Sequence, residues 1–262
     1  MIPVVRIVCI SFLLLALVFL NSGCGEKKGK LIIATDTTLI PMSFIGDDGS
    51  IMGFEPDLIA EIAKIAGFDY EMVSVEWAGL FGGLVTKKYD AVIASVTILE
   101  ERKKRMAFSI PYLKSGLALV VRKETQGIDS IEDIKSKNLL VGAQVGTTSY
   151  FYLEKDPALH KKGYQAYGHA IADLINGEVD AVLGESTGTL YYKNQRKEYF
   201  RKIKMVGEIL TEEHYGIVLS KDNPELMHKI DAALKQLRKN GILKTLHEKW
   251  DLGKAAQVPI ID

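Results

Sequence analysis

Polar side chains that could bind a small charged molecule follow several of the predicted strands. Asp36, Ser95, Thr97 and Glu185 each come after a short apolar run of the kind that forms a buried strand. In open α/β sheets, ligands bind beyond the carboxyl ends of the strands. We therefore expect these hydroxyl and carboxylate groups to face one common site, where they can hydrogen-bond to the charged groups of a ligand.

A positive charge and a helix start complement these acids. Arg102 lies one turn into a predicted helix, and a guanidinium can hold a carboxylate through two parallel charge-assisted hydrogen bonds. Residues 146–149 are predicted to open another helix, whose free backbone N–H groups favour an anion. Asp36 and Glu185 can accept from ammonium or guanidinium groups. Together these groups predict a site for a zwitterionic amino acid.

Each of these residues also has an ordinary structural explanation. An arginine among the charged residues 100–104 is typical of a solvated helix face. An aspartate at a strand end, such as Asp36, often caps a helix, and a tryptophan such as Trp77 often fills a core or a loop. Only the combination indicates a binding site.

The motifs of several enzyme classes are absent from the sequence. There is no Gly-x-Gly-x-x-Gly, no phosphate-binding loop and no Gly-x-Ser-x-Gly. The five histidines are scattered along the chain without the spacing of metal ligands. We therefore predict no cofactor, no metal site and no catalytic residues.

Composition excludes further classes. The chain has 262 residues, in which 33 Lys and Arg balance 33 Asp and Glu, and 47% of the residues are apolar. These values are typical of a folded globular protein. A zero net charge argues against nucleic acid as a partner, because neutralising phosphates requires a surplus of basic residues. The length allows one large domain or two of about 100–150 residues.

The first 23 residues differ from the rest of the chain. Their single charge, Arg6, precedes an apolar run over 7–20, which has the length of a signal-peptide core. Residues 21–24 (Asn-Ser-Gly-Cys) resemble the lipobox of bacterial lipoproteins, although asparagine stands where leucine is usual. We predict a signal peptide over 1–23, lipidation of Cys24 and a lipid-anchored linker over 24–30. The alternatives are secretion with cleavage nearby or a retained N-terminal anchor.

Beyond residue 30, predicted strands alternate with predicted helices. Strands are expected over 31–34, 70–75, 91–93, 117–122 and 139–141, and helices over 57–66, 79–88, 148–155 and 169–176, with two more between 223 and 250. Pro56 just inside the first helix and Gly67 just past its end fit the usual asymmetry of helix ends. Alternation of this kind predicts an α/β fold with mostly parallel sheets.

Two short segments about 90 residues apart resemble each other. Residues 87–93 and 177–183 each combine a helix end, a tight turn and an Asp-Ala-Val strand. This predicts two lobes of similar topology. Because no long linker separates them, we expect extended crossover strands near 114–119 and 210–218, which would form a hinge.

A series of motifs runs in order along the chain. They are 33–44 (Ile-Ala-Thr-Asp-Thr-Thr-Leu-Ile-Pro-Met-Ser-Phe), 53–58 (Gly-Phe-Glu-Pro-Asp-Leu), 77–80 (Trp-Ala-Gly-Leu), 101–104 (Glu-Arg-Lys-Lys), 146–149 (Gly-Thr-Thr-Ser), 180–183 (Asp-Ala-Val-Leu) and 215–217 (Tyr-Gly-Ile). As a set they resemble the bacterial polar amino-acid-binding proteins of ABC importers, extracellular solute-binding protein family 3. The resemblance extends from about residue 30 to residue 253.

The resemblance implies a type II periplasmic-binding-protein-like α/β fold, with two lobes of mixed, mostly parallel sheets joined by two hinge strands. The expected boundaries are 31–114 plus 217–252 for lobe 1, 118–210 for lobe 2 and 253–262 for a tail. It also implies roles for the candidate residues. Arg102, Thr97 and Thr148 would hold the ligand α-carboxylate and Glu185 its α-ammonium. Asp36 and Trp77 would border the ligand side chain, close to Ser95.

The identity of the amino acid stays open between a glutamine-like and a basic ligand. Asp36 suits a basic side chain, but Leu39 stands where relatives often have an aromatic residue. Gln144 and Gly184 occupy positions that hold Lys and His in the glutamine-binding relatives. Glu185 replaces the usual aspartate and adds one methylene to the ammonium partner.

The resemblance implies an exported, monomeric protein that is anchored by lipid to a bacterial membrane. Such a protein delivers a free amino acid to an ABC permease and is not an enzyme. Two alternatives use the same fold. A dehydratase acting on prephenate or arogenate would use Glu185 as a proton donor. A non-transport sensor or adhesin would bind the ligand without a permease.

Overall fold

The protein is described by a computed structural model that covers residues 29–188, 201–253 and 256–259. The predicted signal peptide over 1–23 and the predicted lipidation site, Cys24, lie outside these described residues. The described residues from Leu31 onward belong to one compact unit. Within the described ranges, no helix has the length and apolar character needed to cross a membrane.

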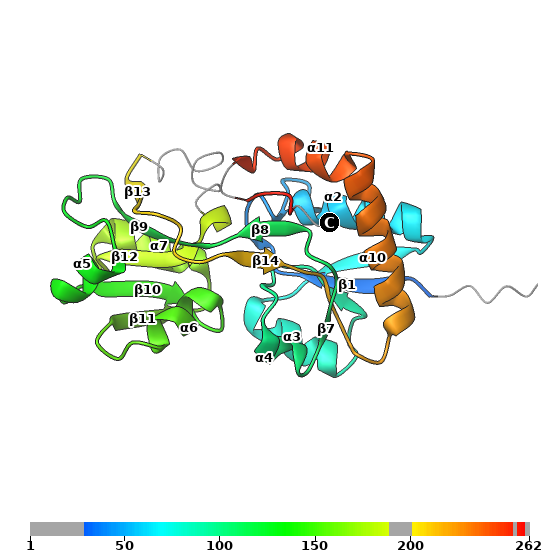
Figure 1. The fold of residues 1–262 in the computed structure, drawn as a ribbon, viewed down its shortest axis with the longest axis horizontal. Coiled ribbons are helices and arrows are strands. Elements are labelled where there is room, and N and C mark those ends of the chain that lie inside the picture. The colour runs from blue at the N-terminus through cyan, green and yellow to red at the C-terminus, as the bar shows by residue number, and fades with distance from the viewer. Residues whose placement is uncertain (1–28, 189–200, 254–255, 260–262) are drawn as a thin grey trace, which may run out of the picture. The chain divides into compact units, whose positions relative to one another are not determined.

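Lobe 1 is built on a five-stranded mixed sheet (Figure 1). Its strands, in spatial order, are β5 (Tyr70–Ser74), β1 (Leu31–Thr35), β6 (Ala91–Val92), β15 (Val218–Leu219) and β7 (Ala107–Phe108). The first three strands run parallel, and β15 is antiparallel to both of its neighbours. Because β15 comes from the C-terminal part of the chain, lobe 1 contains both ends of the described fold.

Lobe 2 has a sheet of the same plan. Its spatial order is β11 (His160–Tyr164), β10 (Leu140–Gln144), β12 (Ala181–Glu185), β9 (Leu117–Arg122) and β13 (Ile203–Val206). Again three parallel strands are followed by an antiparallel strand and its antiparallel neighbour. The two sheets therefore have equivalent topologies, as the repeated Asp-Ala-Val segments predict.

Two paired strands carry the chain between the lobes. They are β8 (Leu113–Ser115) and β14 (Glu213–Tyr215), which run antiparallel and lie next to each other between the two sheets in Figure 1. This confirms the predicted crossover strands. A three-stranded sheet of β2 (Thr38–Leu39), β3 (Ser43–Ile45) and β4 (Ile51–Met52) was not predicted, because strands of two or three residues carry too little alternation to recognise.

The helices mostly match the predicted segments. They are α2 (Phe54–Ala66), α3 (Trp77–Val85), α4 (Glu100–Lys103), α5 (Ile131–Ser136), α6 (Thr148–Glu154), α7 (Tyr167–Asn176), α10 (Pro224–Lys239) and α11 (Ile242–Lys249). Helix α2 ends at Gly67 in the left-handed region, with φ of 69°. Helix α10 begins after Asn223, whose side chain accepts from the Leu226 backbone N–H.

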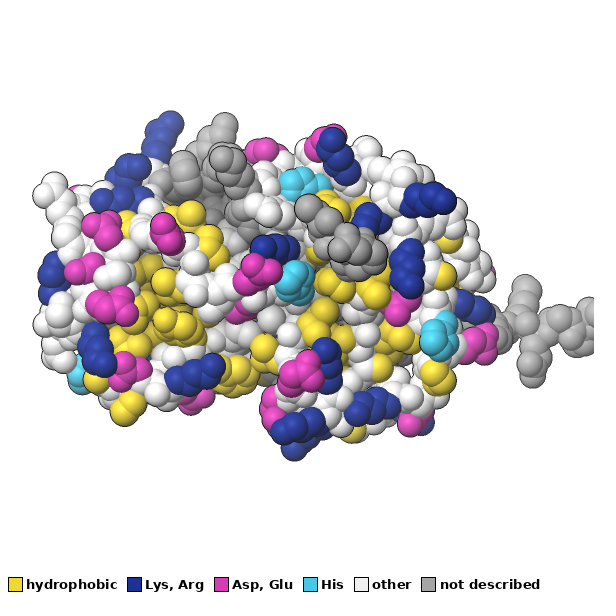
Figure 2. Space-filling view, viewed as in Figure 1, with side chains coloured by type: hydrophobic (Ala, Val, Ile, Leu, Met, Phe, Trp, Pro, Cys, Tyr) yellow, Lys and Arg dark blue, Asp and Glu magenta, His cyan; other side chains and the backbone are white. Residues whose placement is uncertain are grey.

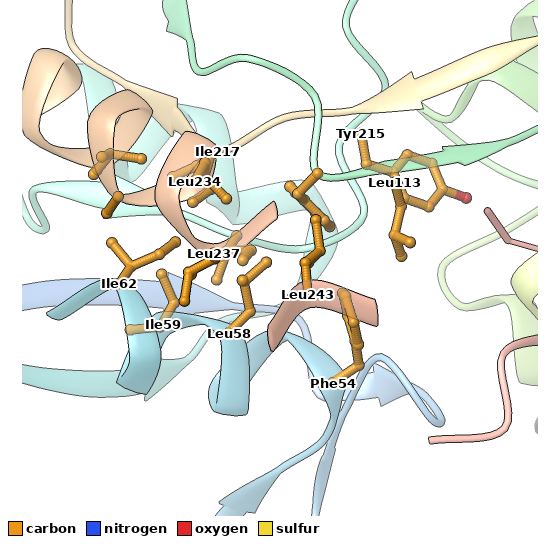
Figure 3. Packing of buried hydrophobic residues seen from close by; sticks show 14 of the residues in the cluster. Phe54, Leu58, Ile59, Ile62, Leu113, Tyr215, Ile217, Leu234, Leu237 and Leu243 are labelled. Atoms are coloured by element: carbon orange, nitrogen blue, oxygen red, sulfur yellow. The ribbon is translucent and has the colours of Figure 1, made fainter. Parts of the chain in front are cut away.

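Helices α2, α10 and α11 cover one face of the lobe 1 sheet with a continuous apolar core (Figure 3). Leu58, Ile62 and Leu234 are completely buried there, and each contributes about 1.5–3 kcal/mol through burial. Ala256 is also completely buried in this core, and Gln257 exchanges two backbone hydrogen bonds with Lys114 of β8, at 2.7 and 2.8 Å. The segment 253–262 was expected as a tail, but its described residues 256–259 pack on lobe 1.

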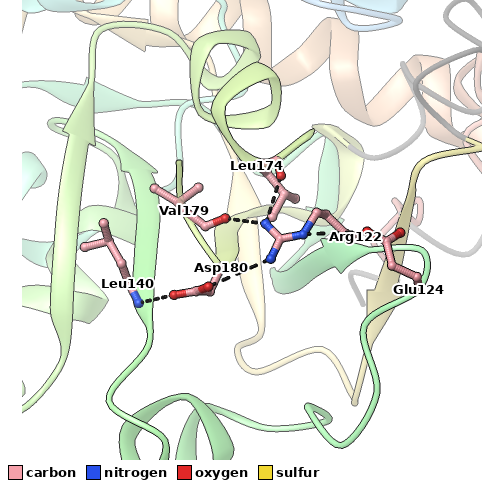
Figure 4. Close-up of polar contacts among 6 residues, drawn as sticks. All are labelled: Arg122, Glu124, Leu140, Leu174, Val179 and Asp180. Carbon is pink, nitrogen blue, oxygen red and sulfur yellow. Dashed lines mark hydrogen bonds and ion pairs between the residues drawn. The ribbon is translucent and has the colours of Figure 1, made fainter. Parts of the chain in front are cut away.

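An arginine fixes the start of β12 in lobe 2 (Figure 4). One guanidinium nitrogen of Arg122 donates to the carbonyls of Leu174 and Val179, at 3.0 and 2.7 Å, which ties β9 to the end of α7. Arg122 also lies 3.8 Å from the carboxylate of Asp180, which accepts from the Leu140 N–H at 2.9 Å. These bonds hold β12 in register between β9 and β10, and so fix Glu185 at its far end.

Charges of both signs are mixed over the surface. On the face shown in Figure 2, Lys and Arg side chains lie interspersed with Asp and Glu side chains. Several charged residues of the described chain form exposed pairs, such as Lys135 with Asp156 at 2.6 Å. Such pairs contribute about 0–1 kcal/mol each, so they affect solubility more than stability.

Candidate functional site

A cavity lies at the carboxyl ends of β1, β6, β10 and β12, where both lobes contribute residues. Its lining includes Asp36, Trp77 and Ser95 from lobe 1 and Gln144 and Glu185 from lobe 2. The carboxyl ends of parallel strands meet at one edge of each sheet, which explains why residues distant in sequence converge here. Four of the seven residues proposed from the sequence, Asp36, Trp77, Ser95 and Glu185, line this cavity.

Among the residues that the structure describes, the charged side chains that line the cavity are all acidic. They are Asp36, Glu55 and Glu185, and the other described lining residues are uncharged. Burial raises the pKa of each of these three carboxyl groups, because removing water disfavours the charged form. A positively charged ligand group would offset this cost, so the cavity suits ammonium or guanidinium groups.

Asp36 is held in place by the chain that follows it. Its Oδ1 accepts from the Thr38 backbone N–H at 2.9 Å, the Asx-type turn that short polar side chains favour. Burial raises its pKa, and hydrogen bonds from Thr38 and Trp77 partly counteract that rise. The side chain is 8% exposed, so it is largely shielded from water at the cavity edge.

Glu55 was missed by the sequence analysis as a functional side chain. It lies in the first turn of α2 and accepts four hydrogen bonds: from Ser95 N at 2.6 Å, Ser95 Oγ at 3.0 Å, Tyr112 Oη at 2.5 Å and Ser43 Oγ at 2.9 Å. Ser95 has φ of 50°, a left-handed conformation that is unfavourable for serine. The two bonds from Ser95 to Glu55 hold that conformation and so position Ser95 at the cavity.

Glu185 faces the cavity from the end of β12. Its Oε2 accepts from the Tyr215 hydroxyl at 2.9 Å, and Tyr215 belongs to the hinge strand β14. Burial, reinforced by the nearby negative charge of Glu213, raises the pKa of Glu185 to about 8. The Tyr215 hydrogen bond and the charge of Arg102 act in the opposite direction. The carboxyl group is thus poised to ionise near neutral pH when a cation approaches.

Arg102 lies beside the cavity lining and joins the two lobes. Its Nη1 donates to the Thr97 carbonyl at 2.9 Å, and its Nη2 donates to the Gly146 carbonyl in lobe 2 at 3.2 Å. The guanidinium lies 5.6 Å from the ring centre of Trp77 and 5.3 Å from that of Phe81, within the range of cation–π interaction. Burial lowers the pKa of Arg102, while the charges of Glu185 and Glu213 raise it.

Trp77 lines the cavity and lies next to the Arg102 guanidinium, and its indole ring restricts which residue fits at position 146. A Cβ added to Gly146 would lie 3.2 Å from the indole nitrogen of Trp77. Gly146 also has φ of 79°, a conformation that favours glycine. The close approach of the two lobes at this point therefore depends on glycine.

Thr97 and Thr148 do not line the cavity. The Thr97 hydroxyl donates to Glu213 Oε2 at 2.8 Å, and the Thr148 hydroxyl donates to the same oxygen at 2.9 Å. Glu213, buried on β14, also accepts from Thr211 Oγ1 through its other oxygen at 3.1 Å. Sequence reasoning missed Glu213, since nothing in its immediate pattern distinguishes it from its exposed neighbour Glu212.

Comparison with known proteins connects this arrangement to a family. Residues 31–254 match the bacterial extracellular solute-binding proteins, family 3. The chain is 31% identical over 227 residues to the L-cystine-binding protein TcyJ of Escherichia coli (strain K12), covering 86% of this chain and 84% of the relative.

Solved structures resemble the fold at similar identity. An ancestral arginine-binding protein, solved bound to arginine and to glutamine, matches with a TM-score of 0.79 and 37% identity, over 86% of this chain and 99% of its own. The ancestral amino-acid-binding protein AncCDT-1, a precursor of cyclohexadienyl dehydratase, matches with a TM-score of 0.78 and 32% identity, over 86% of this chain and 96% of its own.

Proposed function

The chain belongs to the bacterial extracellular solute-binding proteins of family 3, and on that premise we propose that it captures an L-amino acid with a basic side chain. The observation that carries this proposal is the acidic lining of the cavity by Asp36, Glu55 and Glu185. The α-ammonium of an amino acid can form an ion pair with Glu185. A second cationic group, on the ligand side chain, would form an ion pair with Asp36. The ancestral relative was solved bound to arginine and also to glutamine, so the choice of a basic side chain rests on the acidic lining.

Each end of the ligand has a proposed partner. Glu185 accepts from the α-ammonium, and Arg102 with Thr97 and Thr148 binds the α-carboxylate. Asp36 accepts from the side-chain cation, and Trp77 covers the aliphatic part of that side chain, with Ser95 beside it. Charge removed from water must be paired to avoid a large desolvation cost. Pairing every group requires both lobes.

Closure of the lobes is therefore linked to binding. Asp36, Trp77, Ser95, Thr97 and Arg102 belong to lobe 1, and Thr148 and Glu185 to lobe 2, with the paired strands β8 and β14 as the hinge. A shift from 1:99 to 99:1 in favour of the closed form requires about 5.5 kcal/mol of differential affinity. Charge-assisted bonds made only in the closed form can supply it. An ABC permease would then recognise the closed form.

We extend the proposal to the location of the protein. Membership of an extracellular family agrees with export by a signal peptide over 1–23. Lipidation of Cys24 and the linker over 24–30 would then hold a monomer at the membrane that contains the permease. Incorporation of labelled palmitate, lost in Cys24→Ala, would support the anchor, and a secreted unlabelled protein would contradict it.

Calorimetric titration with arginine, lysine, ornithine, glutamine and cystine tests the ligand class. We expect the three basic amino acids to bind most tightly, and to raise the unfolding temperature by mass action. Binding of glutamine or cystine with no response to any basic amino acid would contradict the proposal.

A second candidate function is a dehydratase. Two observations favour it: the likeness to the precursor of cyclohexadienyl dehydratase, and a carboxyl group, Glu185, that is protonated at neutral pH and could donate a proton. Prephenate carries two carboxylates, however, and the acidic lining opposes a dianion. Formation of phenylpyruvate from prephenate, or of phenylalanine from arogenate, by the purified protein would establish this activity.

A further inference from the structure

Glu213 links the two lobes through a single oxygen atom. Its Oε2 accepts from Thr97 Oγ1 in lobe 1 at 2.8 Å and from Thr148 Oγ1 in lobe 2 at 2.9 Å. The Glu213 side chain extends from the hinge strand β14, and the residue is 7% exposed. A charge-assisted bond to a buried carboxylate is roughly twice as strong as a neutral hydrogen bond. Glu213 therefore holds a residue of each lobe to the hinge.

This contact occupies the donors that the proposed function assigns to the ligand carboxylate. A hydroxyl has one proton and donates it to one acceptor at a time. While Thr97 and Thr148 donate to Glu213, neither can donate to a ligand. A ligand carboxylate next to Arg102 would also lie close to the negative charge of Glu213, and like charges repel most strongly where water is excluded.

We propose that Glu213 is a specificity-determining residue, which competes with the α-carboxylate of the ligand for Thr97 and Thr148 and bridges the lobes through them. This inference rests on the proposed function for the identity of the ligand. It implies that an amino acid must displace the Glu213 side chain to bind. An amine with the same cationic side chain but no α-carboxylate escapes that competition, so the site discriminates weakly between the two.

The test compares arginine with agmatine, its decarboxylated amine, in the parent protein and in Glu213→Gln. A glutamine keeps the size of the side chain but removes the charge, so its hydrogen bonds with the threonines are weaker. We expect arginine to bind at least about tenfold more tightly to the variant, because one charge-assisted competitor is lost. Agmatine affinity should stay the same or fall, so the ratio of the two dissociation constants changes by at least that factor.

The adjacent residue provides a matched control. Glu212 is exposed and pairs with Lys114 at 2.7 Å, away from both threonines. Glu212→Gln removes the same charge one position earlier and should leave the arginine-to-agmatine ratio unchanged. An unchanged ratio in Glu213→Gln, or an equal gain in affinity for both ligands, would contradict the proposed competition between Glu213 and the ligand α-carboxylate. Glu213 would then have a structural role only.

A second measurement needs no ligand. Small-angle scattering of the protein alone should give a larger radius of gyration for Glu213→Gln and for Thr148→Val than for the parent and Glu212→Gln. Equal radii in all four proteins would contradict the proposal that Glu213 holds the two lobes together. If no amino acid or amine binds any of them, the proposed function fails, and the scattering result still decides whether Glu213 bridges the lobes.

Discussion

The Tyr215 hydroxyl donates to Glu185 Oε2 at 2.9 Å, which connects the hinge to the acid at the end of β12. Tyr215 also lies 3.0 Å from Ser115 Oγ and 3.1 Å from Thr187 Oγ1, so its hydroxyl belongs to a buried polar cluster. Both Glu185 and Tyr215 have a raised pKa because of burial. The proton on Glu185 is therefore sensitive to any cation that enters the cavity.

Binding should release a proton from Glu185. With a pKa of about 8, this carboxyl group is mostly protonated at pH 7 in the protein alone, and it must ionise to pair the α-ammonium. We expect the affinity for arginine to rise as the pH increases from 6 to 8. Calorimetry in buffers of different ionisation enthalpy should detect up to one proton released at pH 7. No proton release, or tighter binding at lower pH, would contradict this role.

The same group should make stability depend on pH. The pKa of Glu185 is about 8 in the folded protein against an ordinary value of 4.5, so the folded state binds the extra proton between these values. The free energy of unfolding then falls as the pH rises through this window. Glu185→Gln should flatten the fall in unfolding temperature between pH 5 and 8. An equally steep fall in the variant would show that other titrating groups cause the loss of stability.

Arg102→Ala should remove nearly all amino-acid binding while the fold stays intact. The variant loses a charged partner for the α-carboxylate and the bond to Gly146 that joins the lobes at 3.2 Å. Hydrogen bonds to charged groups contribute about 1.5–3 kcal/mol each, so a loss of at least a hundredfold in affinity is expected. Calorimetry and circular dichroism measure the two properties. Near-normal affinity would refute the assignment of this site.

Asp36→Asn should change selectivity rather than abolish binding. The variant keeps the shape of the side chain but loses the charge proposed to pair a basic ligand side chain. We expect arginine affinity to fall by roughly tenfold to a hundredfold, as for a lost charged hydrogen bond, with glutamine affinity nearly unchanged. Asp48→Asn is a suitable control, because Asp48 lies in an exposed turn and accepts from Ser50 at 2.9 Å. Equal losses for arginine and glutamine would contradict the role of Asp36.

The residues at strand ends were predictable, because a short apolar run indicates a buried strand and ligands bind beyond the carboxyl ends of such strands. This reasoning located Asp36, Ser95 and Glu185, which line the cavity. The repeated Asp-Ala-Val segments also have a physical basis: Asp90 accepts from the Ile32 N–H at 2.8 Å, and Asp180 accepts from the Leu140 N–H at 2.9 Å. Each aspartate thus ties its strand to the start of the neighbouring strand in the same way.

Glu55 and Glu213 could not be identified in the same way, because their roles depend on tertiary contacts. The partners of Glu55 lie up to 57 residues away at Tyr112, and Thr97 lies 116 residues from Glu213. A glutamate beside a helix start or in a short charged stretch is normally exposed. The lobe 1 core likewise joins segments that are distant in sequence, among them α2, α10, α11 and Ala256. The residues near 253–262 therefore carry no local pattern that indicates their burial.

Glu55→Ala should destabilise lobe 1 by several kcal/mol. It leaves Ser43, Tyr112 and the Ser95 N–H without the acceptor that they share, and each unsatisfied buried group costs about 1–3 kcal/mol. It also releases Ser95 from φ of 50°, which should weaken ligand binding beyond the loss of stability. Tyr112→Phe removes a single bond and is expected to cost about 1 kcal/mol, with affinity retained. Chemical denaturation and calorimetry of both variants measure these effects, and equal stability of the two would show that the contacts of Glu55 with Ser43 and Ser95 contribute nothing to stability.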